Sequence, residues 1–320
     1  MSKHHGRFSL RALEKGILRA LRCLPIRKAH AAWMATINSH PHIDAMLRSK
    51  GDYQTRHLQS YMHRRWSAAQ KLETLQRHVA FMQDEVQPEV HTALYGVDGA
   101  HYGEPTATGT GVELMQWETK EQAWRLMLLR AQHNKEGELQ LSLQDSDGHE
   151  VYLVVFSIGC DPVQPTQSCL YIGCLQGARP ENGGTALINA FYKQNNGLRA
   201  QSALITALYA FCEAFDIKHM RGIADGFTIN SRYRTKIKTS YDTFWQECHA
   251  EQQADGWFQL PEQEVIRSIE TVKSKHRSAF RKREAWRADA RALLRDAFGT
   301  LRISGHSAVG NRSEAAPSAA

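Results

Sequence analysis

The sequence predicts a mixed α+β protein with a mostly antiparallel sheet, preceded by a helical region and followed by basic helices. Two β-rich runs closed by Gly or Pro lie in the middle of the chain, at 151–158 and 169–175. Before and after these runs, apolar residues recur at three- and four-residue spacing, as on the buried face of a helix. The chain has 320 residues and is 42% apolar, which is enough to bury a sizeable core.

Four regions follow from these patterns: a helical region at 1–90, an α/β core at 91–260, a basic amphipathic region at 261–302 and a disordered tail at 303–320. The helical region contains one apolar stripe at Leu10, Leu13, Ile17, Leu18 and Leu21 and another at Leu72, Leu75, Val79 and Met82. Pro88 and the Gly-rich stretch 96–111 mark the change to strands.

Hydropathy and cysteine spacing indicate a cellular compartment. The sequence has no run of about 18 uncharged apolar residues, so neither a transmembrane anchor nor an ordinary secretory signal is expected. Its six cysteines form no Cys-x-x-Cys pair, which favours reduced thiols. We therefore expect a cytoplasmic protein or one peripheral at the inner membrane.

Within the core region, strands are expected near 112–117, 139–144, 151–158 and 170–175. The turn at 145–148, Asp-Ser-Asp-Gly, predicts that the second and third of these strands form an antiparallel hairpin. After Gly197 the periodicity predicts a helix with one broad buried face, followed by a short strand at 218–224 packed beneath it. A further helix is expected to begin at Tyr241, capped by Ser240 or Asp242, with Phe244 and Trp245 in the core.

The positive charge is concentrated near the end of the chain. Residues 267–302 contain eleven Lys or Arg and four acids, with apolar residues between them, as in a long basic amphipathic helix or two helices in sequence. Such a segment could contact an anionic membrane or an acidic protein. The candidate contact residues are Lys273, Lys275, Arg277, Arg281, Lys282 and Arg283. Alternatively, the helix packs on the core and its charges are solvated. Specific nucleic-acid binding is not expected, because no recognition motif accompanies the charge.

The order of the expected elements, an antiparallel meander followed by strand, helix, strand, helix and strand, is that of the acyl-CoA N-acyltransferase (GNAT-like) fold. Such folds bind a pyrophosphate at the start of the central helix. The matching loop here contains Gln194, Gly197, Leu198 and Arg199, so acyl-CoA or an acyl carrier is a candidate donor, and no metal is expected. Alternatively, Gly197 only ends one helix and Arg199 begins the next.

The same fold analogy suggests catalytic residues. Tyr233 or Tyr241 would protonate the leaving thiolate, and Asp225 is a candidate general base, with Glu113 and Glu247 as alternatives. Tyr241 could equally belong to the apolar core.

Four short motifs carry a family resemblance. They are Gly197-Leu198-Arg199, Tyr241-Asp242-x-Phe244-Trp245-x-Glu247, Asp255-Gly256-Trp257-Phe258-x-Leu260-Pro261 and the basic run Lys273-Ser274-Lys275-His276-Arg277 with Arg281-Lys282-Arg283. In this order they resemble the VirK/YbjX family of Gram-negative bacteria, from the first helices to about residue 297. One departure is Arg199-Ala200-Gln201, where the family tends to have Arg-Pro-Lys.

The resemblance implies a virulence- or envelope-associated bacterial protein and names no reaction. Two hypotheses follow. The first is an acyltransferase-like enzyme that uses a phosphate-bearing acyl donor. The second is a non-catalytic peripheral factor that docks on anionic membrane or an acidic protein through its basic C-terminal helix.

Overall fold

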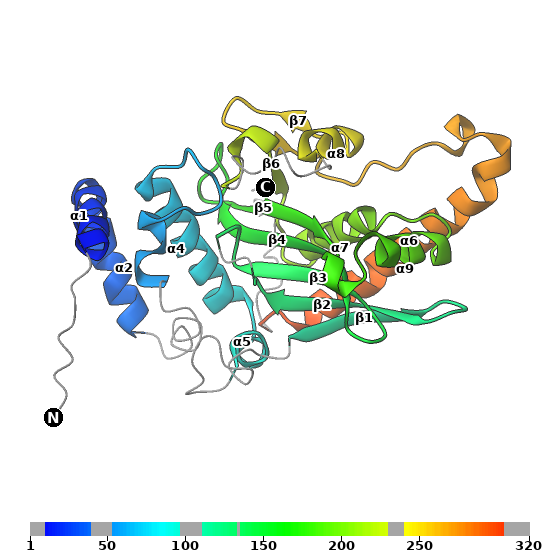
Figure 1. Ribbon diagram of the computed structural model, residues 1–320, viewed down its shortest axis with the longest axis horizontal. Coiled ribbons are helices and arrows are strands. Elements are labelled where there is room, and N and C mark those ends of the chain that lie inside the picture. Colours follow the sequence, from blue (N-terminus) through cyan, green and yellow to red (C-terminus); the bar gives the residue numbers. More distant parts are fainter. Residues whose placement is uncertain (1–9, 40–52, 97–110, 133–134, 230–239, 304–320) are drawn as a thin grey trace, which may run out of the picture.

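The computed structural model describes residues 10–39, 53–96, 111–132, 135–229 and 240–303. In these residues one eight-stranded sheet forms the centre of the molecule, with helices packed against it (Figure 1). The strands are β1 (Val112–Glu118), β2 (Ala123–Arg130), β3 (Leu139–Asp145), β4 (Glu150–Cys160), β5 (Ser168–Gly177), β6 (His219–Ile223), β7 (Glu251–Gln252) and β8 (Trp257–Gln259). The α-helices are α1 (Leu10–Cys23), α2 (Arg27–Ser39), α4 (Ala68–Glu85), α5 (Pro88–Tyr95), α6 (Gly184–Gln194), α7 (Ala200–Ala214), α8 (Tyr241–Glu247) and α9 (Arg277–Thr300).

The sheet is mixed and mostly antiparallel, as the sequence predicts. Its order is β1-β2-β3-β4-β5-β6-β8-β7, and β5 and β6 form a parallel pair. The hairpin expected at 145–148 is confirmed, because β3 and β4 are antiparallel across that turn. Strand β2 was not predicted, although Trp124, Leu126 and Leu128 alternate with more exposed residues and are buried on one face.

Helix α7 is the central helix, and it lies across the sheet as predicted. Eleven of its fifteen residues are buried. The ring of Phe211 is 5.3 Å from Phe156 of β4 and 5.1 Å from Phe298 of α9, measured between centroids. Phe81 of α4 lies 5.9 Å from the same ring. Helix α7 is therefore buried between the sheet and α9, which explains why its sequence is apolar on nearly every side.

The expected basic helix is observed as α9, a single helix of 24 residues. Its apolar side chains Phe280, Leu294 and Phe298 are buried, so the helix packs on the core and presents mainly its charges to solvent. The disordered tail predicted at 303–320 lies almost wholly outside the described residues.

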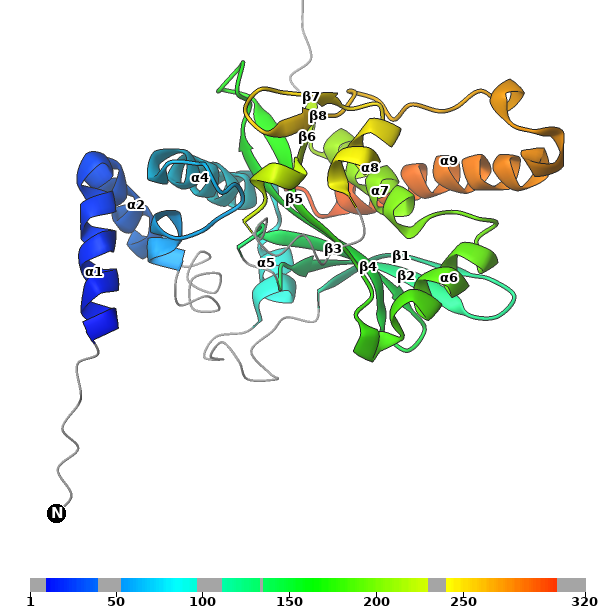
Figure 2. The same cartoon turned by 45° about the horizontal axis from the view of Figure 1, so that its top comes forward.

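The N-terminal helices form one end of the molecule, with α1 outermost (Figures 1 and 2). Ser67 caps α4 in a reciprocal pair with Gln70. Pro88 occupies the first turn of α5, where its missing N–H costs nothing, so the helical region continues to Tyr95. Pro88 therefore begins a helix, and the expectation that it marks the change to strands is wrong.

A buried ion pair joins the short 3-10 helix η2 (Tyr53–Leu58) to the sheet. Arg56 Nη1 lies 2.7 Å from Glu138 Oε1, and the two side chains are 2% and 0% exposed. The guanidinium also lies over the ring of Tyr53, at 4.8 Å. A buried charge without its partner is strongly destabilising. The pair therefore holds together Arg56 and Glu138, which are 82 positions apart in the sequence.

Strands β5 and β6 pair only over Cys169–Ile172 and then diverge. Two side chains of α8 fill the space between them. The Tyr241 hydroxyl donates to Leu175 O at 2.8 Å and accepts from Leu175 N–H at 2.9 Å, and the Trp245 indole N–H donates to Ile223 O at 2.9 Å. The Trp245 ring lies so close to Gly222 that a Cβ there would be 2.4 Å from it. The expected core positions of Phe244 and Trp245 are confirmed.

The Asp-Gly-Trp-Phe motif also holds the fold. Gly256 has φ +89° and lies against the ring of Phe227, where a Cβ would be 2.4 Å away, so the position requires glycine. Asp255 accepts two hydrogen bonds from Arg221 of β6, at 2.9 and 3.0 Å. Trp257 and Phe258 are buried.

We expect Arg56→Met to lower the free energy of unfolding by about 3–5 kcal/mol, because it leaves the Glu138 carboxylate buried without its cation. Urea denaturation followed by circular dichroism measures the loss. The control is Arg295→Met, whose pair with Asp296 is exposed and should change stability by less than about 1 kcal/mol. Equal losses in the two variants would contradict the assignment.

We expect Tyr241→Phe to cost about 1–3 kcal/mol of unfolding free energy, since it leaves the N–H and C=O of Leu175 buried without partners. The same urea titration applies, with Tyr192→Phe as control because Tyr192 is 49% exposed. An unchanged stability of the Tyr241 variant would mean that the hydroxyl does not hold β5.

Candidate functional site

The loop between α6 and α7 contains the residues predicted to hold a phosphate. Helix α6 ends in this loop, where the Gly197 N–H donates to Tyr192 O at 2.8 Å and Gly197 adopts φ +80°. Gly197 thus has the helix-ending role proposed for it as the alternative. The absence of a side chain at Gly197 also leaves room for Arg283, because a Cβ at this position would lie 3.3 Å from Arg283 Nη1.

A cavity of about 650 Å³ opens at the start of α7. Its lining comes from four separate parts of the chain: the α6–α7 loop with the first turn of α7, the end of α8, the segment before α9, and the first turns of α9. The lining residues are Tyr192, Gly197, Leu198, Arg199, Ser202, Gln246, Glu247, His249, Val265, Arg267, Phe280, Arg283, Glu284 and Arg287. Four arginines thus face two glutamates, which gives the cavity an excess of positive charge.

Arg199 lies at the mouth of the cavity, as the N-cap of α7. Its guanidinium is 2.5 Å from Glu247 Oε2, and both side chains are nearly half exposed. It also lies over the ring of Phe244, at 5.6 Å. As a donor without an acceptor atom, the Arg199 side chain makes no capping hydrogen bond to α7. The start of α7 also carries the positive end of the helix dipole.

Helix α9 supplies the opposite wall. Arg283 Nη1 donates to Asn196 O at 2.8 Å, which joins α9 to the α6–α7 loop. Arg287 lies 3.5 Å from Glu284 and 3.9 Å from Glu264. Two polar atoms here, Glu284 Oε2 and Arg287 Nε, are buried and make no hydrogen bond to the described residues.

Glu264 is a largely buried carboxylate beside this cavity, 12% exposed, that sequence reasoning missed. It accepts a hydrogen bond from Thr206 Oγ1 of α7, with O···O distances of 3.0 and 3.1 Å to its two oxygens. Burial raises the pKa of its carboxyl group, and Arg287 partly opposes that rise. Glu264 lines a smaller cavity of about 70 Å³ that shares Arg199 and Arg287 with the larger one. Its sequence context, an irregular segment after Pro261, contains no periodicity that could have marked it.

Of the four predicted phosphate-binding residues, Gly197, Leu198 and Arg199 line the cavity and Gln194 does not. The Gln194 amide accepts from Thr119 Oγ1 at 2.9 Å and donates to Glu121 at 2.7 Å. It therefore joins α6 to the turn between β1 and β2.

Of the predicted catalytic residues, Tyr241 and Asp225 do not line the cavity, whereas Glu247, an alternative general base, does. The Tyr241 hydroxyl is bonded to Leu175, and burial raises the pKa of its phenol well above the usual range. The Asp225 carboxylate accepts from Tyr241 N–H at 2.9 Å and from Ser240 Oγ at 2.7 Å, so it anchors the start of α8. Tyr233 lies outside the described residues.

The six basic residues proposed for membrane or partner binding separate into two groups. Lys273, Lys275, Arg281 and Lys282 are exposed. Arg277 and Arg283 are half-buried, and Arg277 Nε donates to Val272 O at 3.0 Å. Arg283 thus belongs to the cavity, which brings the predicted phosphate loop and the predicted basic helix together at one place.

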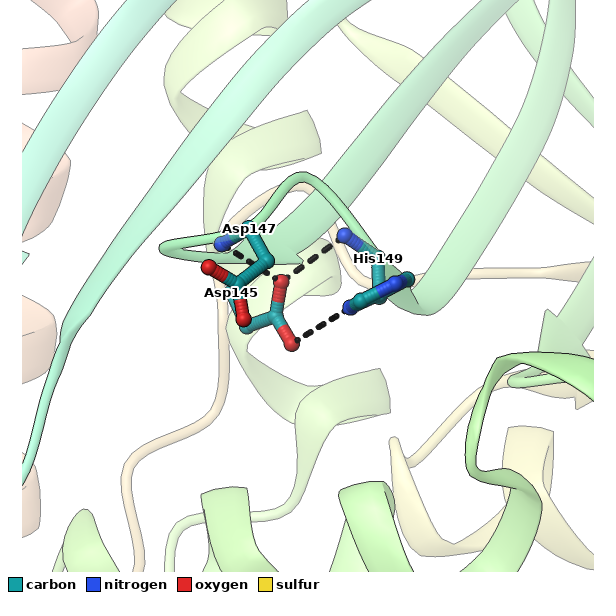
Figure 3. Close-up of side chains that lie close together, drawn as sticks. All are labelled: Asp145, Asp147 and His149. Carbon is teal, nitrogen blue, oxygen red and sulfur yellow. Dashed lines mark hydrogen bonds and ion pairs between the residues drawn. The ribbon is translucent and has the colours of Figure 1, made fainter.

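Among the described residues, one group of side chains lies close enough to share a metal ion: Asp145, Asp147 and His149, in the β3–β4 turn (Figure 3). Asp145 Oδ1 accepts from the backbone N–H groups of Asp147 and His149, at 3.0 and 2.8 Å, and Oδ2 lies 3.3 Å from His149 Nδ1. Hydrogen bonds from backbone N–H groups to the side chain of the aspartate that begins the turn are typical of an Asx turn. They explain why the three side chains lie close together. We assign no metal to it.

A search of the described helices found none with the length and apolar character needed to cross a membrane.

Comparison with known proteins finds a family without an assigned activity. An uncharacterized protein of Haemophilus influenzae is 29% identical over 154 residues, which are 46% of this chain and 48% of that protein. The chain therefore matches about half the length of this relative. A family model described as a protein of unknown function, DUF535, matches residues 10–295, from the first residue of α1 to the last turns of α9. By this match over most of its length, the chain belongs to the DUF535 family.

Proposed function

We propose that this DUF535 protein is a VirK/YbjX-like, envelope- or virulence-associated bacterial protein that acts as an acyltransferase-like enzyme. Its acyl donor would carry phosphate, as acyl-CoA and acyl carriers do, and would bind in the cavity at the start of α7. The observation that carries the proposal is the combination of four arginines with the largely buried carboxylate of Glu264 in the adjoining cavity.

The chemistry of the cavity suits a phosphate group. Guanidinium groups bind phosphate oxygens through paired N–H donors, and the start of a helix adds backbone amides and a positive dipole. Arg283 and Arg287 come from α9 and Arg199 from the N-cap of α7, so an anion between them would be approached from two sides. Their glutamate partners, Glu247 and Glu284, would be exchanged for the ligand.

The sheet supports the GNAT analogy at one place, the parallel β5–β6 pair with α7 in the connection between its strands. However, the space where these strands diverge contains Tyr241 and Trp245. A donor would therefore lie along the start of α7 and α9, outside the strand pair.

Glu264 is the residue we propose as general base. In transfer of an acyl group to an amine, a carbon–nitrogen bond forms, the carbon–sulfur bond of the thioester breaks, and the amine loses a proton. A carboxylate with a raised pKa, beside the arginines that hold the donor, suits acceptance of that proton. Tyr241 has no role in this proposal, because its hydroxyl bonds to β5.

The alternative function, a peripheral factor that docks through its basic C-terminal helix, has weaker support. Its exposed cations Lys273, Lys275, Arg281 and Lys282 could meet an acidic surface. Most of the apolar face of α9 is buried against the core, however, with Phe298 on Phe211 of α7 and Trp286 against Trp117 of β1.

We expect calorimetry to detect binding of CoA, acyl-CoA or an acyl carrier with a Kd below about 1 mM. Arg283→Ala should weaken binding about tenfold or more, the loss typical of a hydrogen bond to a charged group. Arg281→Ala is the matched control, because Arg281 lies on the same helix, is exposed and does not line the cavity. The proposal fails if no donor binds, or if the two variants weaken binding equally.

The pH dependence of stability tests the environment of Glu264. Because burial raises its folded-state pKa above the ordinary 4.5, the folded protein holds this proton more tightly than the unfolded chain. Its favourable contribution is complete below pH 4.5 and is lost as the pH rises through the folded-state pKa. The stability of the wild type should therefore fall across this window relative to that of Glu264→Gln. Urea titrations at several pH values measure the difference. The control is Glu262→Gln, at an exposed carboxylate two residues away, which should not change the pH dependence. A difference of opposite sign for Glu264→Gln would contradict the assignment.

A further inference from the structure

Helix α1 exposes apolar side chains to an unusual degree. Among the described residues, nine large hydrophobic side chains are exposed, and four of them fall within eight consecutive positions of α1 and the turn after it. Ile17, Leu18, Leu21 and Leu24 are 54%, 46%, 56% and 58% exposed. A concentration of this kind indicates a contact surface, whereas single exposed apolar residues are ordinary.

The four side chains share one side of the helix. Positions 17, 18, 21 and 24 are separated by one, four and seven residues, which places them on the same face. In the sequence, the same spacing continues back to Leu13 and Leu10. With 14 residues, α1 is shorter than the roughly 20 needed to cross a bilayer, so it suits a position in the plane of a surface.

The sequence of this end of the chain is strongly basic. Residues 1–39 contain eight Lys or Arg and a single acid, Glu14. Residues 1–39 and residues 267–302 thus each carry a net charge of +7. The rest of the chain carries −7, which leaves the whole chain at +7. Arg22, Arg27 and Lys28 are exposed beside the apolar face.

A second basic feature lies next to α1. A cavity of about 530 Å³ is lined by Arg22 of α1, by Arg64 and Lys71, and by Ala68 and Ala69 in the first turn of α4. This cavity offers space for a phosphate-bearing group beside the exposed leucines.

The position of α1 leaves it accessible. It is the outermost described helix at one end of the molecule, beyond α2 and α4, in both views (Figures 1 and 2). A flat surface could approach it without meeting the sheet.

We infer that α1 is a membrane-docking helix that lies on an anionic phospholipid surface. Its apolar side chains enter the acyl boundary, its flanking arginines and lysines meet the lipid phosphates, and the cavity beside it receives a headgroup. An anionic bilayer supplies both an apolar layer and negative charge. A second copy of the chain would instead bring two strongly basic segments together, which like-charge repulsion opposes. This surface is distinct from α9 and independent of the proposed acyl transfer.

The test is flotation of the full chain with vesicles of phosphatidylglycerol and phosphatidylethanolamine, compared with vesicles of phosphatidylcholine alone. We expect binding to the anionic vesicles that weakens with added salt, and about tenfold or more loss of partitioning in the Ile17→Gln/Leu21→Gln variant. Leu293→Gln, at an exposed apolar residue of α9, is the matched control and should change partitioning less than about threefold. The replaced side chains are exposed, so circular dichroism should show all variants folded.

Three results would overturn the inference. One is the absence of wild-type binding to anionic vesicles. Another is loss of binding on charge reversal of Arg281 and Lys282 with no effect of the α1 variant, which would assign docking to α9. The third is a lipid-free oligomer, seen by sedimentation velocity, that the α1 variant dissociates, since a second copy would then cover this face.

Discussion

The hydroxyl of Tyr241 and the indole of Trp245 fill the space between β5 and β6, the parallel strand pair of the described sheet. The arrangement of the candidate site depends on this packing. Leu175 has no strand partner on the β6 side, so its N–H and C=O both bond to the Tyr241 hydroxyl. Trp245 occupies the adjoining space against Gly222, where any side chain would collide. Because these two residues are fixed, α8 is fixed, and its last turn places Glu247 against Arg199.

The cavity forms where α7, α8 and α9 converge. Helix α7 has the sheet on one side and α9 on the other, through Phe211, and its first turn is therefore held beside the first turns of α9. This packing brings Arg283 and Arg287 to the loop that contains Gly197. Two features that are 87 residues apart at Asn196 and Arg283, a helix-start loop and a basic helix, thus become one positively charged site with a largely buried carboxylate at its side.

The short motifs singled out in the sequence mostly hold the fold. Tyr241 and Trp245 fill the diverging strands, Asp255 pairs with Arg221, and Gly256 allows Phe227 to approach. These residues therefore bear on the architecture of this chain more directly than on a reaction. Arg199, Glu247 and Arg283 are the charged members of these motifs that line the cavity, and they are the ones whose replacement bears on the proposed function.

Local periodicity by itself determined several of the elements of this protein. Helices α4 and α7 and strands β1, β3, β4 and β5 follow from apolar spacing, because that spacing reflects which side of each element is buried. Strand β2 showed the same alternation at Trp124, Leu126 and Leu128 and could have been predicted. Tertiary structure alone decided that Tyr241 bonds to Leu175, that α9 lies on α7, and that Glu264 is largely buried beside Arg287. The reason is physical: a side chain's burial, partners and pKa depend on residues brought close by folding, and no spacing along the chain encodes them.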